Sequence, residues 1–143
     1  MEELVVRYVH FLAIIALIST LVGELVLVQK KMNLKDFKKL ALVDGVYGLA
    51  AITTLVAGFL LWFVVGKPAE FYSANFVFHI KISLFVLVGL LSTIPTYFFF
   101  RKRNDTSEHI LVPGYVLTVI RVELVLLALI PMFGVLIARG IGN

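Results

Sequence analysis

The sequence predicts an all-α protein, a bundle of four membrane-spanning helices with both termini on the outer, periplasmic side. Three observations predict this fold. The 143-residue chain is 61% hydrophobic and 15% charged, whereas soluble chains are about 45–50% apolar and about 25% charged. Four apolar segments are long enough to cross a bilayer, which takes about 20 helical residues. The basic residues gather in two short loops between these segments.

The predicted spans are residues 5–28, 41–65, 76–100 and 114–138. Backbone polar groups in lipid must be bonded within their own segment, so the spans are helices. The first span is expected to be a retained helix, because acidic residues precede it and no small-residue cleavage site follows it. The connections are too short for a soluble domain, so residues 1–143 form a single integral membrane domain.

The charged loops predict the orientation. Five lysines lie between residues 30 and 39, after the first span, and Arg101, Lys102 and Arg103 follow the third. Short loops rich in Lys and Arg stay in the cytoplasm. Both termini are therefore expected in the periplasm, and the protein in the cytoplasmic (inner) membrane of a bacterium.

Composition excludes several classes of function. The chain has no cysteine, which excludes disulfides, thiolate metal sites, iron–sulfur clusters and cysteine nucleophiles. Its net charge is +4, but the basic residues gather in loops, which is the pattern of membrane topology. The expected partner is the lipid bilayer and not a nucleic acid.

Eight ionisable residues lie within the spans or at their edges. A charge at the centre of a span costs about 2.5–3.5 kcal/mol on insertion scales, so such residues are candidates for function. The topology sorts them into two layers. The outer layer holds Arg7, His10, His79 and Lys81, and the inner layer holds Glu24, Asp44, Arg121 and Glu123.

Helical periodicity predicts which of these residues share a face. His10 and Glu24 are separated by close to four complete turns, so they lie on one stripe of the first span. His79 begins a stripe on the third span that continues through Ser83, Val86, Leu90 and Thr93. Lys81 lies about 200° from His79, so only one of the two can point at the bundle axis. By the same spacing, Glu123 points away from Arg121.

The outer layer suits a haem. Two neutral imidazoles at one depth, His10 and His79, can ligate the iron of haem b. Arg7 and Lys81 lie where the haem propionates would need cations, and an arginine binds a carboxylate in bidentate fashion. The alternative is that both histidines are interfacial residues that hydrogen-bond each other or nearby hydroxyl groups.

Small residues and prolines mark the other spans. Gly45, Gly48 and Gly58 of the second span let helices approach closely or leave room for a flat ligand. Pro95 and Pro131 each free a backbone carbonyl. Kinks are expected there, with the hydroxyl of Thr93 or Thr96 taking up part of the lost bonding.

The inner layer also has two interpretations. Glu24, Asp44 and Glu123 can carry protons or bind a cation, and with Lys81 they are the candidates for catalytic groups. Arg121 can hold an anionic headgroup or a quinone carbonyl. The favoured interpretation pairs Arg121 with Glu24 or Asp44 in a structural ion pair, which leaves the unpaired carboxylate for proton delivery.

Five strings together resemble an uncharacterised bacterial family of four-helix inner-membrane proteins. They are Arg7-Tyr8-Val9-His10, Asp44-Gly45-Val46-Tyr47-Gly48, Phe78-His79-Ile80-Lys81, Ser92-Thr93-Ile94-Pro95-Thr96 and Arg121-Val122-Glu123. The resemblance covers nearly the whole chain. It implies the same fold and brings no established activity.

A more distant resemblance is to the HemJ-type protoporphyrinogen oxidases. His10, the pair His79 and Lys81, and the last span with Glu123 and Pro131 are similar to motifs of that family. The resemblance implies a haem b or porphyrin pocket on His10, His79 and Lys81. The family's Asn-Glu-x-Pro string is absent, so tetrapyrrole binding is better supported than porphyrinogen oxidation.

Three functions follow as expectations. The first is a haem b protein, an oxidoreductase that moves electrons between a membrane quinone and an acceptor at the outer face. The second is a HemJ-like oxidase acting on a porphyrin. The third is a cofactor-free ion or proton transporter, or a membrane scaffold, that uses Glu24 and Asp44. A homodimer is compatible with so short a chain.

Overall fold

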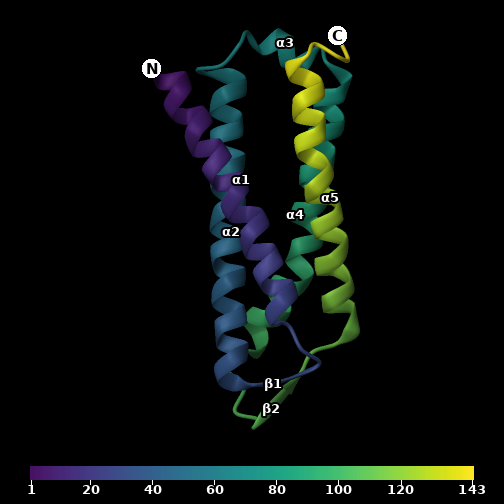
Figure 1. Ribbon diagram of the computed structural model, residues 1–143. Coiled ribbons are helices and arrows are strands. Elements are labelled where there is room, and N and C mark those ends of the chain that lie inside the picture. Colours follow the sequence, from purple (N-terminus) through teal and green to yellow (C-terminus); the bar gives the residue numbers. More distant parts are fainter.

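The computed structural model describes residues 1–143 and confirms the four-helix membrane bundle (Figure 1). The long apolar helices are α1 (Glu2–Leu27), α2 (Leu34–Phe63), α4 (Phe76–Lys102) and α5 (Gly114–Ala138). Both chain termini and the short helix α3 (Ala69–Ser73) lie at one end of the bundle, the terminal end. The strands β1 (Lys31–Asn33) and β2 (His109–Leu111) lie at the opposite end, the sheet end.

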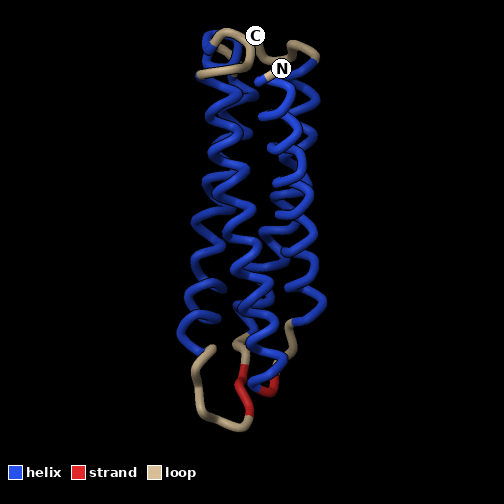
Figure 2. The backbone as a smooth tube through the Cα atoms, turned by 90° about the vertical axis from the view of Figure 1, so that its left-hand side faces the viewer, coloured by secondary structure: helices blue, strands red, loops and turns tan.

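The long helices form two antiparallel pairs. α1 packs mainly against α2, and α4 packs mainly against α5. All four run along the long axis of the molecule, as the turned view in Figure 2 shows. Large apolar side chains cover the outside, for example Val26, Leu42 and Leu90, each more than 60% exposed. Such a surface suits lipid, in which apolar side chains need no burial against protein.

The helix of the second span begins before residue 41, where its apolar part starts. α2 begins at Leu34 because Asn33 caps it: the side-chain oxygen of Asn33 accepts a hydrogen bond from the backbone N–H of Asp36 at 2.8 Å. Such a cap satisfies one of the free donors at a helix start. The polar first turns therefore extend the helix on the N-terminal side of the predicted span.

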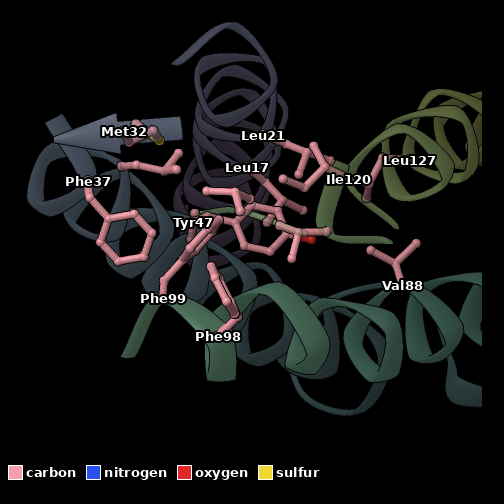
Figure 3. Packing of buried hydrophobic residues seen from close by; sticks show 14 of the residues in the cluster. Leu17, Leu21, Met32, Phe37, Tyr47, Val88, Phe98, Phe99, Ile120 and Leu127 are labelled. Atoms are coloured by element: carbon pink, nitrogen blue, oxygen red, sulfur yellow. The ribbon is translucent and has the colours of Figure 1, made fainter. Parts of the chain in front are cut away.

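A two-stranded antiparallel sheet closes the sheet end, and the sequence did not predict it. Met32 of β1 is paired with Ile110 of β2, and both side chains are buried. They belong to the same core as Phe37, Phe98 and Phe99. These three rings pack edge to face at centroid distances of 5.8–6.1 Å (Figure 3), a favoured aromatic geometry. The sheet thus ties the two helix pairs together.

The main core fills the middle of the bundle and its sheet end. It includes Leu17, Leu21, Tyr47, Ile120 and Leu127 from three helices (Figure 3). At the terminal end, a second cluster has only three buried members, Val77, Phe78 and Ile137. The N-terminal half of α1 takes no part in either, since its first buried residue is Ala13. Packing is therefore thinner toward the terminal end.

The chain's C-terminus is docked on the start of α4. Asn75 is fully buried, and its side-chain oxygen accepts hydrogen bonds from the backbone N–H groups of Val77 and Phe78 at 2.9 and 3.2 Å. The amide of Asn75 donates to the carbonyl of Ile141 at 3.0 Å, and the N–H of Phe76 donates to the carbonyl of Gly142 at 3.2 Å. One side chain thereby caps a helix and holds the tail.

Pro95 and Pro131 lie inside α4 and α5, which continue through them. The sequence-based expectation that Thr93 or Thr96 compensates for Pro95 is wrong. The hydroxyl of Thr93 donates to the carbonyl of Leu90 at 2.6 Å, and that of Thr96 donates to Asp44. The hydroxyl of Thr96 thus turns toward the buried side chain of Asp44 on α2 and not toward its own helix, although the residue itself is exposed.

Candidate functional site

Three acidic side chains meet in the interior of the bundle. Glu24 comes from α1, Asp44 from α2 and Glu123 from α5, and their exposed fractions are 1%, 5% and 0%. We call these three residues the carboxyl cluster. Glu24 is in the last turn of α1, so the cluster lies in the half of the molecule nearer the sheet end. This agrees with the inner layer that the sequence predicted for these acids.

Two hydroxyl groups point at the carboxyl cluster. Tyr47 donates a hydrogen bond to Oε1 of Glu123 at 3.2 Å, and Thr96 donates to Oδ1 of Asp44 at 2.9 Å. Because Thr96 belongs to α4, all four long helices contribute a side chain. Sequence reasoning assigned no contact to Tyr47 and expected Thr96 to compensate for Pro95, so it missed both hydroxyl donors. Only the three-residue spacing from Asp44 to Tyr47, which puts them on one helix face, signalled the first contact.

Two oxygens of the carboxyl cluster lack a donor, and none of its three acids has a counter-charge. Oε1 of Glu24 and Oε2 of Glu123 are buried without any hydrogen-bond partner, and the charged groups that act on Glu24 are the acids Asp44 and Glu123. The chain has two ion pairs, Arg7 with Glu3 and one at the end of α4, and neither touches the cluster. Unpaired buried charges are costly, so this arrangement favours bound protons.

The expected ion pair between Arg121 and an inner acid is absent. Arg121 is exposed on the outside of α5, while Glu123 is fully buried. The two residues are about 200° apart on the helix, and Glu123 occupies the inward position. The prediction that Arg121 pairs with Glu24 or Asp44 was therefore wrong, because it considered depth in the membrane and not the direction of the side chain.

A metal ion is not an evident occupant of the carboxyl cluster. No three His, Cys, Asp or Glu side chains anywhere in the chain lie close enough together to hold one. The acids therefore do not converge on a common point as ligands of a metal must.

The structure does not bring His10 and His79 together. His79 is exposed on the outer face of α4, and its Nε2 lies 2.8 Å from the carbonyl oxygen of Ser73. The rest of its predicted stripe, Ser83, Val86, Leu90 and Thr93, is exposed as well. Lys81 is the residue that turns inward, as the 200° separation allows. These positions do not fit a haem held between two histidines.

His10 packs on α2 instead. Its Nδ1 lies 3.0 Å from the carbonyl oxygen of Thr54, and a Cβ on Gly58 would approach its Cε1 at 3.3 Å. Gly58 thus provides close approach, one of the roles predicted for the small residues of this span. Around Gly45 and Gly48 an added Cβ would meet nothing within 4 Å, so these two glycines do not serve close approach between helices.

The cations proposed for haem propionates are also separated. Arg7 is exposed and pairs with Glu3 one turn earlier on α1. Lys81 is largely buried on α4 and is among the charged groups that act on His10. Of the four residues predicted for the outer layer, the structure therefore brings together only His10 and Lys81.

Comparison with known proteins identifies the family. A family model described as "Predicted membrane protein (DUF2214)" matches residues 2–142. No curated protein and no solved structure matches the chain, so the more distant resemblance to HemJ-type oxidases stays a prediction. The match over almost the whole length, together with the four apolar helices, shows that the chain belongs to the DUF2214 family of multi-pass membrane proteins.

Proposed function

We propose that this protein carries protons within the membrane, with the carboxyl cluster as the site where they bind and leave. One observation supports this above all others: Glu24 and Glu123 each bury a carboxyl oxygen that has no hydrogen-bond partner. Asp44 lies with them, and no basic side chain pairs with any of the three. In a membrane interior, ionisable residues of this kind are typical of proton relays.

Protons suit the carboxyl cluster better than larger cations. Three carboxylates in a low-dielectric interior repel one another, and bound protons relieve this without a set of converging ligands. The absence of any three-residue group able to hold a metal argues in the same direction.

The two hydroxyl donors distinguish the three acids. Tyr47 supports one oxygen of Glu123, and Thr96 supports one oxygen of Asp44. Glu24 receives no hydroxyl donor and faces both other acids. We therefore place the exchangeable proton on Glu24.

Proton flux into vesicles tests this proposal. The purified protein is reconstituted in liposomes that contain a pH-sensitive dye, and a potassium diffusion potential drives protons inward. We expect flux above that of protein-free liposomes, with most of it lost in Glu24→Gln and Asp44→Asn. Glu70→Gln, a change at an acid on the surface of α3, is the matched control and keeps full flux. Equal flux in wild type and Glu24→Gln contradicts the proposal.

Binding of haem b stays a prediction of the sequence, and with it quinone-linked electron transfer and porphyrin oxidation. The separation of His10 and His79 weighs against ligation by both. A protein purified after expression with haem supplied provides the test: a Soret band that disappears in His10→Ala and persists in His79→Ala would revive this alternative with His10 as the ligand.

A further inference from the structure

A second polar site lies toward the terminal end, apart from the carboxyl cluster. We propose that Lys81 and His10 bind the anionic headgroup, a carboxylate or a phosphate, of an amphiphile dissolved in the bilayer. This inference does not depend on proton transport, because it uses neither the acids nor the hydroxyls of the carboxyl cluster.

Lys81 is a partly buried cation that lacks an acceptor within the protein. Its side chain reaches from α4 to α5, where Nζ would lie 3.8 Å from a Cβ added to Gly134. No carboxylate forms an ion pair with it, and no protein group accepts a hydrogen bond from it. An ammonium group has three donors, and leaving them unbonded away from water is costly. A ligand oxygen would satisfy them.

His10 has a second free polar atom, and its ring is near enough to Lys81 for that charge to act on it. A carbonyl oxygen can only accept, so the contact with Thr54 means that Nδ1 of His10 carries the hydrogen. Nε2 has no protein partner. It donates a hydrogen bond to an anion when the ring is protonated, and it accepts one from a protonated headgroup oxygen when the ring is neutral. The charged groups that act on His10 are Lys81 and Arg7, both cations. The surroundings are therefore positive, as an anion requires.

The fold leaves this site open to lipid. The half of α1 that carries His10 has no buried residue before Ala13. The small core at the terminal end, Val77, Phe78 and Ile137, is built by α4 and α5. Figure 1 shows α1 leaning away from those two helices toward its N-terminus. Because apolar helices surround the site, its anion is expected to arrive on a hydrocarbon chain.

The only tryptophan provides a probe. Trp62 of α2 packs edge to face on Phe78 at 4.7 Å between ring centroids, and Phe78 lies one turn before Lys81 on α4. Bromine on an acyl chain quenches tryptophan fluorescence at short range. The protein is reconstituted in neutral phosphatidylcholine and titrated separately with a brominated fatty acid, brominated phosphatidic acid and brominated phosphatidylcholine.

We expect saturable quenching by the fatty acid, by the phosphatidic acid or by both, and this result shows whether a carboxylate or a phosphate is preferred. Lys81→Met should raise the ligand concentration at half-saturation about tenfold or more, as loss of a charge-assisted hydrogen bond predicts. Lys81→Arg should bind with the affinity of the wild type. Lys67→Met, at an exposed lysine over Phe71, is the matched control and should bind normally.

A second variant guards against loss of folding. Gly134→Leu fills the space beside the ammonium and keeps both polar groups, and we expect the same weakening. The proposal is overturned if neither anionic probe saturates, if neutral brominated phosphatidylcholine quenches equally, or if Lys81→Met and Gly134→Leu both bind like the wild type.

Discussion

At the scale of single residues, the decisive property is the direction in which an ionisable side chain points. The topology predicted from the sequence placed Lys81 and His79 at one depth in the membrane, and Glu123 and Arg121 at another. The structure turns one member of each pair inward and leaves the other on the surface. The inward members, Lys81 and Glu123, have no charged partner, and unlike His79 and Arg121 they are largely removed from the surface. Function is therefore expected at these residues and not at His79 or Arg121.

The hydroxyl of Tyr47 should contribute to stability through Glu123. Tyr47→Phe removes the donor at 3.2 Å from Oε1 of Glu123 and leaves that carboxyl without any partner. The cost of an unsatisfied buried group predicts a loss of about 1–3 kcal/mol, measured by unfolding in detergent. Tyr97→Phe, an exposed tyrosine without a hydrogen bond on α4, should change stability by less than about 0.5 kcal/mol. Equal effects of the two changes would show that the contact contributes nothing.

Arg121 tests the structure against the sequence-based expectation. Because this side chain is exposed and unpaired, Arg121→Ala should change the unfolding free energy by less than about 0.5 kcal/mol and leave proton flux unaltered. A buried pair with Glu24 or Asp44 would instead make the change cost about 3–5 kcal/mol. A loss of that size in detergent unfolding would mean that the arginine reaches the acids after all.

The residues of the site were thus predictable only in part. Composition and topology identified Glu24, Asp44 and Glu123, since any acid in a span attracts attention. The hydroxyl of Thr96 escaped notice because threonine is common in spans and because its partner Asp44 is distant in the chain. The prediction that His10 and His79 lie together was wrong. It considered only that both residues lie at one depth in the membrane, whereas contact also requires that their side chains point toward each other.

At the scale of elements, the four long helices follow from hydropathy, and the short elements do not. A run of about 20 apolar residues has one stable form in lipid, so the helix ends were predictable to within three residues, except for the start of α2, which lies seven residues before the predicted span. The strands Lys31–Asn33 and His109–Leu111 and the helix Ala69–Ser73 are too short to leave a periodic pattern. They form through tertiary contacts, such as Met32 and Ile110 on the aromatic rings.

The docking of the tail on α4 predicts a requirement for glycine at position 142. Gly142 has φ of 100°, and a Cβ there would lie 2.5 Å from Oδ1 of Asn75 and 2.6 Å from Cγ2 of Val77. Gly142→Ala should therefore release the tail and weaken the cap of α4, seen as faster hydrogen exchange at the amides of Val77 and Phe78.

Gly140 provides the control for that change. It also has a positive φ, 74°, but an added Cβ would meet nothing within 4 Å. Gly140→Ala carries only the backbone penalty of about 1 kcal/mol, so exchange at α4 should be much less affected. Similar exchange in the two variants would mean that the close approach of Gly142 to Asn75 has no influence on the start of α4.

At the scale of the whole molecule, the two ends of the bundle differ in how densely they are packed and in the charge of their polar residues. The sheet end has the dense aromatic core beneath the sheet, and the carboxyl cluster is enclosed just within it. Toward the terminal end the core thins, and Lys81 and His10 are only partly buried. A sealed acidic site and an accessible basic one occupy opposite halves of the same bundle. Which half faces the cytoplasm therefore determines from which side protons reach Glu24.

The orientation can be tested with single cysteines, because the native chain has none. Thr106→Cys lies in the loop at the sheet end, and Ala74→Cys lies at the terminal end; both positions are exposed. Eight lysines and arginines border the sheet end, so the positive-inside rule places that end in the cytoplasm. In intact bacterial cells a membrane-impermeant maleimide should label Ala74→Cys, and should label Thr106→Cys only after permeabilisation. The parent chain should stay unlabelled throughout, and equal labelling of both variants after denaturation should verify equal amounts. The reverse pattern would place both termini in the cytoplasm, and protons would then reach Glu24 from the outer side.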